Sequence, residues 1–451
     1  MQNTSQIDWD IILDNIPPNA NEATVSSKFI PSLFQGLGFG GGDECPQFNT
    51  GRGADCVDFA ARRHKPGESS FLFSKTNPYL LVEVKGRATN AGARINLSCG
   101  TPAYRDTQAQ IIRYLLAPNC VTAQWGIITN STHIQLFRRH GKIVIPATAN
   151  LLIKKENIHG IISHIKQLID KPPRSLSICI YNNKGGVGKT TTVINLAAIL
   201  RKEGKRVLVV DFDSQADSSQ SLNVSSGEVT LSECLIDTKL DIRKAVVSFS
   251  VTDRNGKTAH LFDVIPCDNG MDRFINSEFH ASIQRGIKRL RDLLNIFTYS
   301  YDYILIDCPT QWLFFSQSGV YASDVVLIPS KHNGLTSLHN AVRVIRDFIP
   351  EIQKERRDGG PVALPIFFNG ERITEHSRRI AEEEIDKIVS QNDQLLPYFR
   401  PKATKGNKST FIFHLPAYAS VANAAFVNLP AVFVHKTVAE HYLGLAKEYF
   451  L

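Results

Sequence analysis

Residues 181–197 read YNNKGGVGKTTTVINLA, a glycine-rich turn that follows the apolar run LSICI of residues 176–180. Glycines let the backbone adopt unusual dihedral angles and approach a ligand closely, so successive N–H groups can surround a phosphate. A helix that begins near Lys189 would direct its N-terminal dipole at the same phosphate. The order of strand, glycine turn and helix therefore predicts a phosphate-binding loop.

The loop departs from the ordinary pattern GxxxxGK[ST], because Asn183 stands where the first glycine would be and a second lysine, Lys184, precedes the glycines. We expect the backbone from Gly185 to Thr190 to bind a β-phosphate and Lys189 to reach the β- and γ-phosphates. The residues predicted to bind the nucleotide are Lys184, Gly185, Gly186, Gly188, Lys189, Thr190 and Thr191.

The segments after residue 175 alternate between helical stretches and short, continuous apolar runs, which are RVLVVDFD, LFDVIPC, YDYILIDCPT, DVVLIPS and VALPIFFN. Strands of this kind are buried on both faces, so the fold class predicted here is α/β with a mostly parallel sheet between helices. Asp307 ends one such strand, where open α/β sheets place their ligands. We therefore predict that Asp307 and the Thr190 hydroxyl hold Mg²⁺.

The segments KGGVGKTT, RVLVVDFDSQ and YDYILIDCPT resemble the deviant Walker A, Walker A′ and Walker B motifs of the ParA/MinD family of ATPases. The resemblance continues to the ending LPAVFVHKTVAEHYLGLAKEY, at residues 429–449. In that family two subunits sandwich two ATP molecules, and the extra lysine reaches the partner's nucleotide. The resemblance thus implies that Lys184 acts across an ATP-dependent homodimer.

The same resemblance implies that Asp213 positions the attacking water and that Asp211 supports the magnesium side of the site. It also places Asn369, in PIFFNG, at adenine, although an Asn-Gly turn explains that residue equally well. The family often has DTPP after the Walker B strand, whereas this chain has DCPTQ. The loss of the second proline puts the geometry of that switch segment in question, while Asp307 and Pro309 remain.

The clearest boundary lies at Pro172-Pro173, where an amphipathic helical pattern stops just before the strand that leads into the glycine turn. We therefore expect two domains, one at residues 1–170 and the ATPase domain at 175–451. The first has a mixed pattern of helices and short strands, which predicts a small mixed sheet.

In the first domain, Glu83 and Lys85 follow the apolar run PYLLV and point to the same face of a strand. A carboxylate and an ammonium at a strand end suit magnesium-dependent phosphodiester cleavage, because the carboxylate holds the ion and the lysine orients or activates water. Asp55, in ADCVDF, is the preferred second ligand, and Asp58 is its rival. Such a charged pair alone is more often an ordinary surface pair.

The order of these residues resembles the PD-(D/E)-x-K nuclease superfamily, particularly the amino-terminal domains of type I restriction motor subunits. The resemblance adds Glu22, on the helix ahead of LGFGGGDE, to the magnesium ligands Asp55 and Glu83, and gives Gln110 a catalytic role beside Tyr114. It implies a restriction-endonuclease-like mixed-sheet domain. A domain of this fold can also persist as a noncatalytic DNA-binding or docking module.

The 451 residues carry a formal charge of +8, which favours an anionic partner, and 43% are hydrophobic, as in ordinary globular proteins. Three basic segments, at 62–65, 287–292 and 399–408, are candidates for nonspecific contacts with the DNA backbone. Eight cysteines without metal-ligand spacing fit buried thiols in a reducing compartment. We expect a cytoplasmic, nucleoid-associated protein that uses ATP and Mg²⁺, without membrane contact.

The leading hypothesis is a DNA-binding ParA-type ATPase fused to a magnesium-dependent nuclease-like domain, acting on foreign or plasmid DNA. The alternative is a partition or positioning ATPase whose first domain is a noncatalytic adaptor and which works with a small DNA-binding adaptor protein. A metabolic enzyme related to cobyrinate or dethiobiotin synthetases shares the variant loop, but it fits the chain's ending and its first domain less well.

Overall fold

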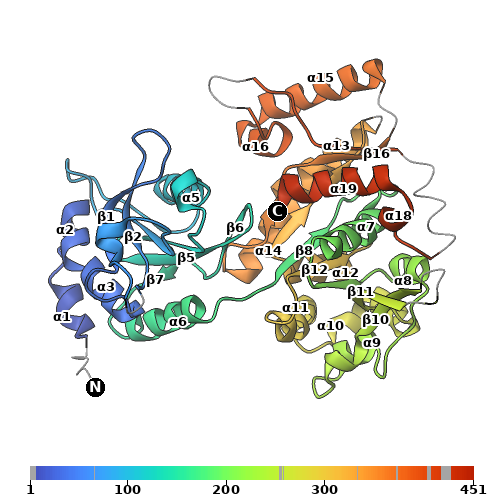
Figure 1. Ribbon diagram of the computed structural model, residues 1–451, viewed down its shortest axis with the longest axis horizontal. Helices are drawn as coiled ribbons and strands as arrows, with labels where there is room; N and C mark the ends of the chain where they lie inside the picture. The colour runs from blue at the N-terminus through green and yellow to red at the C-terminus, as the bar shows by residue number, and fades with distance from the viewer. Residues whose placement is uncertain are drawn as a thin grey trace. The chain divides into compact units, whose positions relative to one another are not determined.

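The computed structural model describes residues 7–64, 67–252, 256, 258–332, 334–371, 374–403, 408–417 and 428–451. The chain forms two compact units, Met1–Pro173 with Arg357–Gly359 and Arg174–Arg356 with Gly360–Leu451. Each unit has its own sheet (Figure 1). Among the described residues, we find no helix with both the length and the apolar character that a membrane span needs.

The N-terminal unit is built on one mixed sheet of order β1-β2-β3-β4-β5-β6, with β7 paired to β5. Its strands are β1 (Glu44–Asn49), β2 (Cys56–Ala61), β3 (Leu80–Val84), β4 (Trp125–Thr129), β5 (His133–His140), β6 (Ile143–Pro146) and β7 (Leu151–Leu152). β3 and β4 are parallel, whereas the other neighbours are antiparallel. Parallel neighbours need a crossover, which α5 (Pro102–Leu115) supplies.

Helices cover both faces of this sheet, as Figure 1 shows. One core joins Val82 and Val84 to the helices α1 (Trp9–Asp14), α2 (Glu22–Lys28), α3 (Ile30–Leu37) and α6 (Ile158–Asp170). The other core joins Leu81 to α4 (Phe71–Ser74) and α5. Side chains alternate along a strand, so Glu83 shares the α5 face with Leu81.

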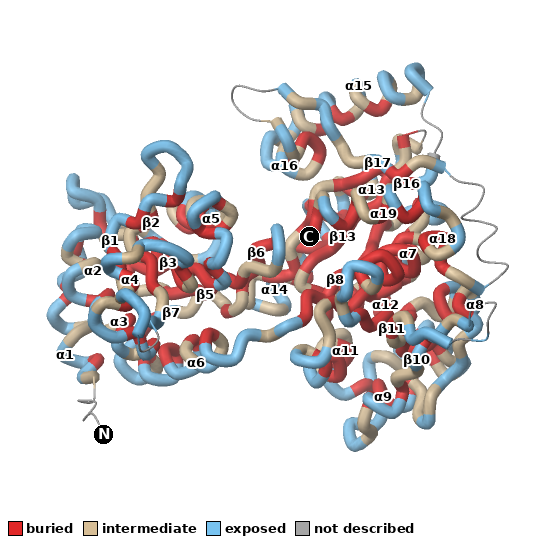
Figure 2. Tube along the Cα trace, viewed as in Figure 1, coloured by how far each residue is buried: buried red, intermediate tan, exposed pale blue. Residues whose placement is uncertain are grey.

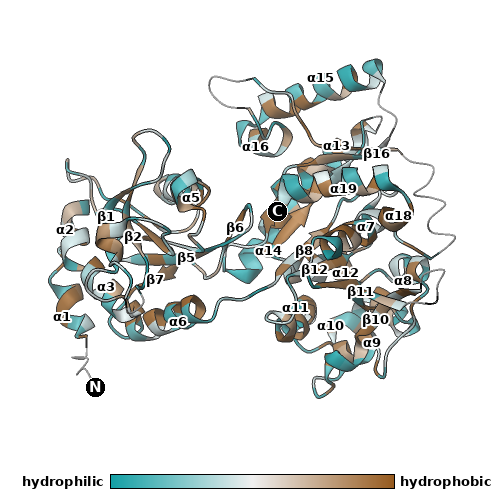
Figure 3. Cartoon of the chain, viewed as in Figure 1, coloured by the Kyte–Doolittle hydropathy of each residue, from teal (hydrophilic) through white to brown (hydrophobic). Residues whose placement is uncertain are grey.

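The C-terminal unit contains a sheet of order β10-β11-β9-β12-β8-β13-β15. Its strands are β8 (Leu176–Ile180), β9 (Val207–Asp211), β10 (Val247–Thr252), β11 (Thr258–Ile265), β12 (Tyr303–Asp307), β13 (Val325–Leu327) and β15 (Val362–Ala363). All neighbours are parallel except β10 at the edge. Every residue of β8, β9 and β12 is buried, as the continuous apolar runs predict (Figures 2 and 3).

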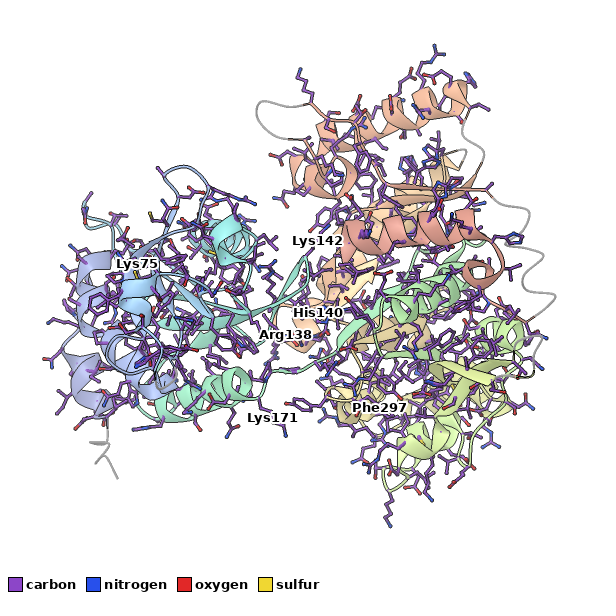
Figure 4. All side chains as sticks on the ribbon, in the orientation of Figure 1. Lys75, Arg138, His140, Lys142, Lys171 and Phe297 are labelled. Atoms are coloured by element: carbon purple, nitrogen blue, oxygen red, sulfur yellow. The ribbon has the colours of Figure 1, made fainter. Side chains whose placement is uncertain are left out.

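Helices form layers around this sheet. α7 (Lys189–Lys202) contacts β8, β9, β11 and β12, together with α18 (Ala431–Val434) and α19 (Lys436–Tyr449). Another core, which includes Phe297 (Figure 4), joins alternate strand residues to α9 (Leu231–Ile236), α11 (Arg289–Leu294), α12 (Phe314–Ala322), α13 (Leu335–Arg343) and α14 (Ile349–Arg356). α8 (Asp217–Leu222) and α10 (Ser277–Ala281) follow β9 and β11.

The run VALPIFFN is one strand in the sequence-based prediction but two strands in the structure. β15 joins the large sheet, whereas β16 (Phe367–Glu371) pairs with β14 (Pro329–Ser330) and β17 (His414–Pro416) in a separate small sheet. Pro365 lies between β15 and β16 and cannot donate to a ladder, so the strand breaks there. α15 (Glu375–Gln391) and α16 (Leu396–Phe399) lie between β16 and β17 in the chain.

Candidate nucleotide site and carboxylate cluster

The glycine turn after β8 leads directly into α7, which begins at Lys189 as predicted. Gly188, just before the helix, has φ +80°, a conformation that residues with a Cβ rarely adopt. A Cβ at Gly188 would also lie 2.3 Å from Nδ2 of Asn369. Glycine is therefore needed at this position both for the backbone and for the close approach of Asn369.

Asn369, on β16, holds the loop through its side-chain amide. Its Nδ2 lies 2.8 Å from the carbonyl oxygen of Val187, 3.2 Å from that of Gly188 and 3.1 Å from the hydroxyl of Thr192. These acceptors use both hydrogens of the amide nitrogen, so only Oδ1 of Asn369 could contact adenine. The contact with adenine stays a prediction. The structure shows Asn369 first of all as a residue that positions the loop.

Asn369→Ala should lower the free energy of unfolding by about 1–3 kcal/mol, because the carbonyl oxygen of Val187 loses its side-chain donor. It should also weaken nucleotide binding, since the loop loses its support. Denaturant titration and nucleotide titration measure the two effects. The exposed Asn295→Ala in the same unit is the matched control, and equal behaviour of the two variants would contradict the role given to Asn369.

The two lysines of the loop have different surroundings. Lys189 is 9% exposed, and burial lowers the pKa of its ammonium, while the nearby Asp307 and Asp213 raise it. Lys184 is exposed, as a side chain must be if it is to reach a second subunit. The carbonyl oxygen of Asn183 accepts a hydrogen bond of 2.9 Å from Nδ2 of Asn340, which fixes the start of the loop.

Two aspartates, Asp307 and Asp211, lie at the ends of the adjacent strands β12 and β9. Asp307 ends β12, and its Oδ2 accepts a 2.7 Å bond from the Ser218 hydroxyl; burial raises the pKa of this carboxyl, and the nearby hydroxyls of Ser218 and Thr190 partly lower it. Asp211 ends β9 and accepts bonds from the Ser219 N–H (2.8 Å) and hydroxyl (2.6 Å). Burial and then the charge of Asp307 raise the pKa of Asp211.

Ser218 and Ser219, in the first turn of α8, are not among the residues predicted from the sequence. Their signal is the pair of serines in DFDSQADSS, close enough to reach back to the strand end. They hold the two acids in place, and Asp211 therefore supports the site from behind.

A cavity of about 760 Å³ opens in front of the loop. Among the predicted site residues, those that line it are Gly185, Gly186, Gly188, Lys189, Thr190, Thr191 and Asp213. Burial raises the pKa of Asp213, which the Gln215 N–H partly offsets. Ile275 and Leu313 line the same cavity, and their side chains are exposed apolar groups. The size is in the range of small-molecule sites.

A second group of charged residues lies at the end of β3 in the N-terminal unit. Glu83 is 2% exposed, and Nζ of Lys85 lies 2.6 Å from its Oε1. Asp58, on β2, accepts the Val84 N–H at 2.7 Å, and the antiparallel register sets it opposite Glu83. Burial, followed by the charge of Asp58, raises the pKa of Glu83 to about 7.

Glu22 joins this group from the first turn of α2, with its Oε2 3.9 Å from Nζ of Lys85. Gly86 allows this approach, because a Cβ there would lie 2.9 Å from the Glu22 nitrogen and 2.5 Å from the Ala88 carbonyl oxygen. The glycine directly after VEVK is the sequence signal for this close approach. We call Glu22, Asp58, Glu83 and Lys85 the carboxylate cluster.

The structure does not bring Asp55 to the carboxylate cluster, which corrects the preference for Asp55 over Asp58. Asp55 precedes β2 in the turn after β1, and its carboxylate pairs with Nε of Arg113 at 3.2 Å. Gln110 forms the expected pair on α5, donating to the Tyr114 hydroxyl at 2.8 Å. A catalytic role of Gln110 stays a prediction.

Two buried carboxylate oxygens stand out as acceptors without a donor. Within the described parts of the chain, Oε2 of Glu83 and Oδ1 of Asp307 are the carboxylate oxygens that are buried and unpartnered. Leaving such an atom unpaired costs about 1–3 kcal/mol or more, and a cation would remove that cost. In the described parts of the chain, no group of three His, Cys, Asp or Glu side chains is arranged to hold a metal ion. A magnesium ion at either carboxylate would therefore be bound by one or two carboxylates and by water, as is common for Mg²⁺.

The basic segments are largely engaged within the protein. Arg63 pairs with Asp170 at 2.6 Å, and Arg289 is buried and donates to the Cys234 carbonyl oxygen at 2.7 Å. Lys65 and residues 404–407 lie outside the described residues.

Comparison with known proteins bears on the C-terminal unit. A family model described as an AAA domain matches residues 175–357. The sporulation initiation inhibitor protein Soj of Bacillus subtilis is 36% identical over 174 residues, which are 38% of this chain and 65% of Soj. The chromosome partitioning protein ParA of Myxococcus xanthus is 32% identical over 194 residues, which are 40% of this chain and 62% of that protein. The chain spans slightly less than two thirds of the length of these relatives.

One similar solved structure is a variant of McdA from Cyanothece in complex with ATP. It is 20% identical with a TM-score of 0.47, and the match covers 61% of this chain and 96% of the McdA chain. MinD from Pyrococcus furiosus has 20% identity and a TM-score of 0.45, covering 60% and 97%. The sequence matches and the loop, strand and acid geometry above agree: the C-terminal part of this chain carries a P-loop fold and is similar to the ParA-type chromosome partitioning proteins.

Proposed function

We propose that this protein is an ATP-dependent, dimerising switch on DNA whose N-terminal unit cleaves phosphodiester bonds with Mg²⁺. The observation that carries the proposal is that, among its described residues, each unit holds one buried, unpartnered carboxylate oxygen near a lysine. These oxygens are Oδ1 of Asp307 near Lys189 and Oε2 of Glu83 near Lys85. A carboxylate with a free lone pair beside a phosphate-binding cation suits a magnesium–phosphate complex.

In the C-terminal unit, the loop would bind ATP and Asp307 with the Thr190 hydroxyl would hold Mg²⁺. Mg²⁺ supplies charge neutralisation on the phosphates. Lys189 would bind the β- and γ-phosphates, and Asp213 on the cavity wall would orient the attacking water. The serines that hold Asp307 and Asp211 keep both carboxylates fixed during turnover.

Three exposed residues at or near the cavity are the basis for proposing a dimer. Lys184 is exposed at the loop, and Ile275 and Leu313 expose 60% and 56% of their surface at the cavity. A second subunit would bury both apolar side chains and bring its own Lys184 to the nucleotide. Hydrolysis would then follow assembly, because the transferring phosphoryl group gains its last cation only in the closed dimer.

In the N-terminal unit, Glu83 and Asp58 would hold Mg²⁺ and Lys85 would orient a water molecule for attack on a DNA phosphate. Glu22 lies close enough to Lys85 to share in this role. The substrate is inferred from the chemistry of the carboxylate cluster and from the resemblance to nucleases. Two such units in one ATP dimer could cut both strands, which suits action on foreign or plasmid DNA.

A second candidate function is a partition or positioning ATPase whose N-terminal unit is a noncatalytic adaptor. The names of the relatives favour it, since ParA of Myxococcus xanthus is described as a chromosome partitioning protein. It predicts DNA binding that needs no divalent metal, stimulation of ATP turnover by a small DNA-binding protein, and no cleavage of DNA.

Incubation of the full chain with supercoiled plasmid, with and without ATP and Mg²⁺, tests the two candidates. Nicked or linear plasmid that requires Mg²⁺ is the result expected for the nuclease, and chelation with EDTA should abolish it. Intact plasmid under every condition, with ATP-dependent retention of DNA, would reject the nuclease and leave the positioning ATPase.

A further inference from the structure

A second cavity lies in the C-terminal unit between α15 and the small sheet of β14, β16 and β17. Its volume is about 260 Å³, and its walls include the cationic or imidazole side chains Arg378, Arg400, His332 and His414 and the aromatic rings of Phe368 and Phe411. No role in the proposed ATP or DNA chemistry accounts for this cavity.

The alternation of β16 separates this cavity from the nucleotide site. Phe368 pairs with His414 across β16 and β17, and both side chains line the second cavity. The next residue, Asn369, turns to the opposite face, where it bonds to the phosphate-binding loop. The two cavities have no lining residue in common, so a ligand in one leaves the other open.

The charged side chains that line the second cavity are Arg378, Arg400 and Glu382. Arg400 is 5% exposed, and its guanidinium donates to the Thr410 carbonyl oxygen at 3.2 Å and to Asp386 at 2.8 Å. Arg378 is close enough to His332 that, after burial and His414, its charge lowers the pKa of that imidazole. The one carboxylate among the lining residues is Glu382. Because Asp386 already pairs with Arg400, Arg378 is the arginine that would hold an anion here.

His332 has an unused polar atom at this cavity. Its side chain is 6% exposed, and Nδ1 has no hydrogen-bond partner among the described residues. The imidazole stacks on the ring of Phe368, with the ring centres 3.4 Å apart. An imidazole held flat in this way can offer a hydrogen bond at a fixed position to a ligand.

We propose that this cavity binds a small organic anion, with one phosphoryl or carboxyl group held by Arg378 and the imidazoles of His332 and His414. The apolar part of the ligand would lie against Phe368 and Phe411, since these rings form the remaining wall with aliphatic neighbours. The cavity volume limits the ligand to a compact body of about one ring, by comparison with the size of ordinary ligand sites.

Calorimetric titration of the full chain with phenyl phosphate and, separately, with benzoate tests the proposal. ADP and Mg²⁺ are kept saturating so that the phosphate-binding loop is occupied. We expect saturable binding of at least one probe. Arg378→Gln should weaken it at least 10-fold, whereas Arg379→Gln, an exposed neighbour on α15 outside the cavity lining, should leave it within twofold.

His332→Leu provides a second variant and should also weaken the probe, with the thermal unfolding curve showing that the protein is folded. Binding of only one probe supports the proposal and restricts the ligand to that head group. The proposal is overturned if neither probe saturates, or if Arg378→Gln and Arg379→Gln bind the probe equally well.

Discussion

Lys184→Ala should lower the rate of ATP turnover at least about 100-fold and leave the Kd for ATP almost unchanged. Cations supplied across an interface contribute about 10³–10⁵ in rate to phosphoryl transfer, whereas Lys184 is exposed and lies outside the lining of its own cavity. Lys189→Ala should behave differently and lose binding, because Lys189 is buried and lines the cavity.

Single-turnover hydrolysis and nucleotide titration measure the two effects, and light scattering with and without ATP reports the dimer. Lys239→Ala, an exposed lysine of the same unit, is the matched control. Native turnover by Lys184→Ala would remove the catalytic role of Lys184 altogether.

A mixing experiment separates action across the dimer from action within one subunit. Lys184→Ala and Asp213→Asn should each be inactive alone. In a mixed dimer, the Lys184→Ala subunit keeps Asp213 and receives Lys184 from its partner, so one site is complete. An equal mixture should therefore regain about a quarter of the native rate, since about half of the dimers formed by random pairing are mixed. No recovery would show that Lys184 acts within its own subunit.

The phosphate-binding loop could be predicted from the sequence because its determinants are local. Gly188 is needed at a left-handed φ, Lys189 starts the helix, and the run ending in Asp307 is buried on both faces. Each of these features is set by residues within one turn or one strand. The same reasoning predicted the parallel strands β8, β9 and β12 with bounds close to those observed.

The carboxylate cluster could be predicted only in part, because it depends on the register between strands. Glu83 and Lys85 share a face by simple alternation, but the choice between Asp55 and Asp58 depends on where β2 begins, and no local pattern marked the turn before Cys56. Asn369 illustrates the same limit, since its bonds to Val187 and Gly188 join segments far apart in the chain. Contacts of this kind are set by packing.

Glu83→Gln should reduce magnesium-dependent plasmid cleavage at least about 100-fold, because the amide cannot supply the charge that a divalent cation requires. The substitution keeps the shape of the side chain, and burial already raises the pKa of Glu83 to about 7. An uncharged group is therefore tolerated at this position, and the free energy of unfolding should change by less than about 1 kcal/mol. Loss of cleavage would then report chemistry and not misfolding.

Asp58, on β2, and Asp55, in the turn before it, provide a matched pair of variants for this prediction. Asp58→Asn should lose cleavage as Glu83→Gln does, since Asp58 lies opposite Glu83 on β2, whereas Asp55→Asn should cleave at the native rate, since Asp55 pairs with Arg113 outside the carboxylate cluster. Titration with Mn²⁺ should follow the same order, with weaker binding in the first two variants only. If Asp55→Asn lost cleavage and Asp58→Asn kept it, the role given to the carboxylate cluster would be refuted. If all three variants kept cleavage, the activity would belong to a contaminating nuclease.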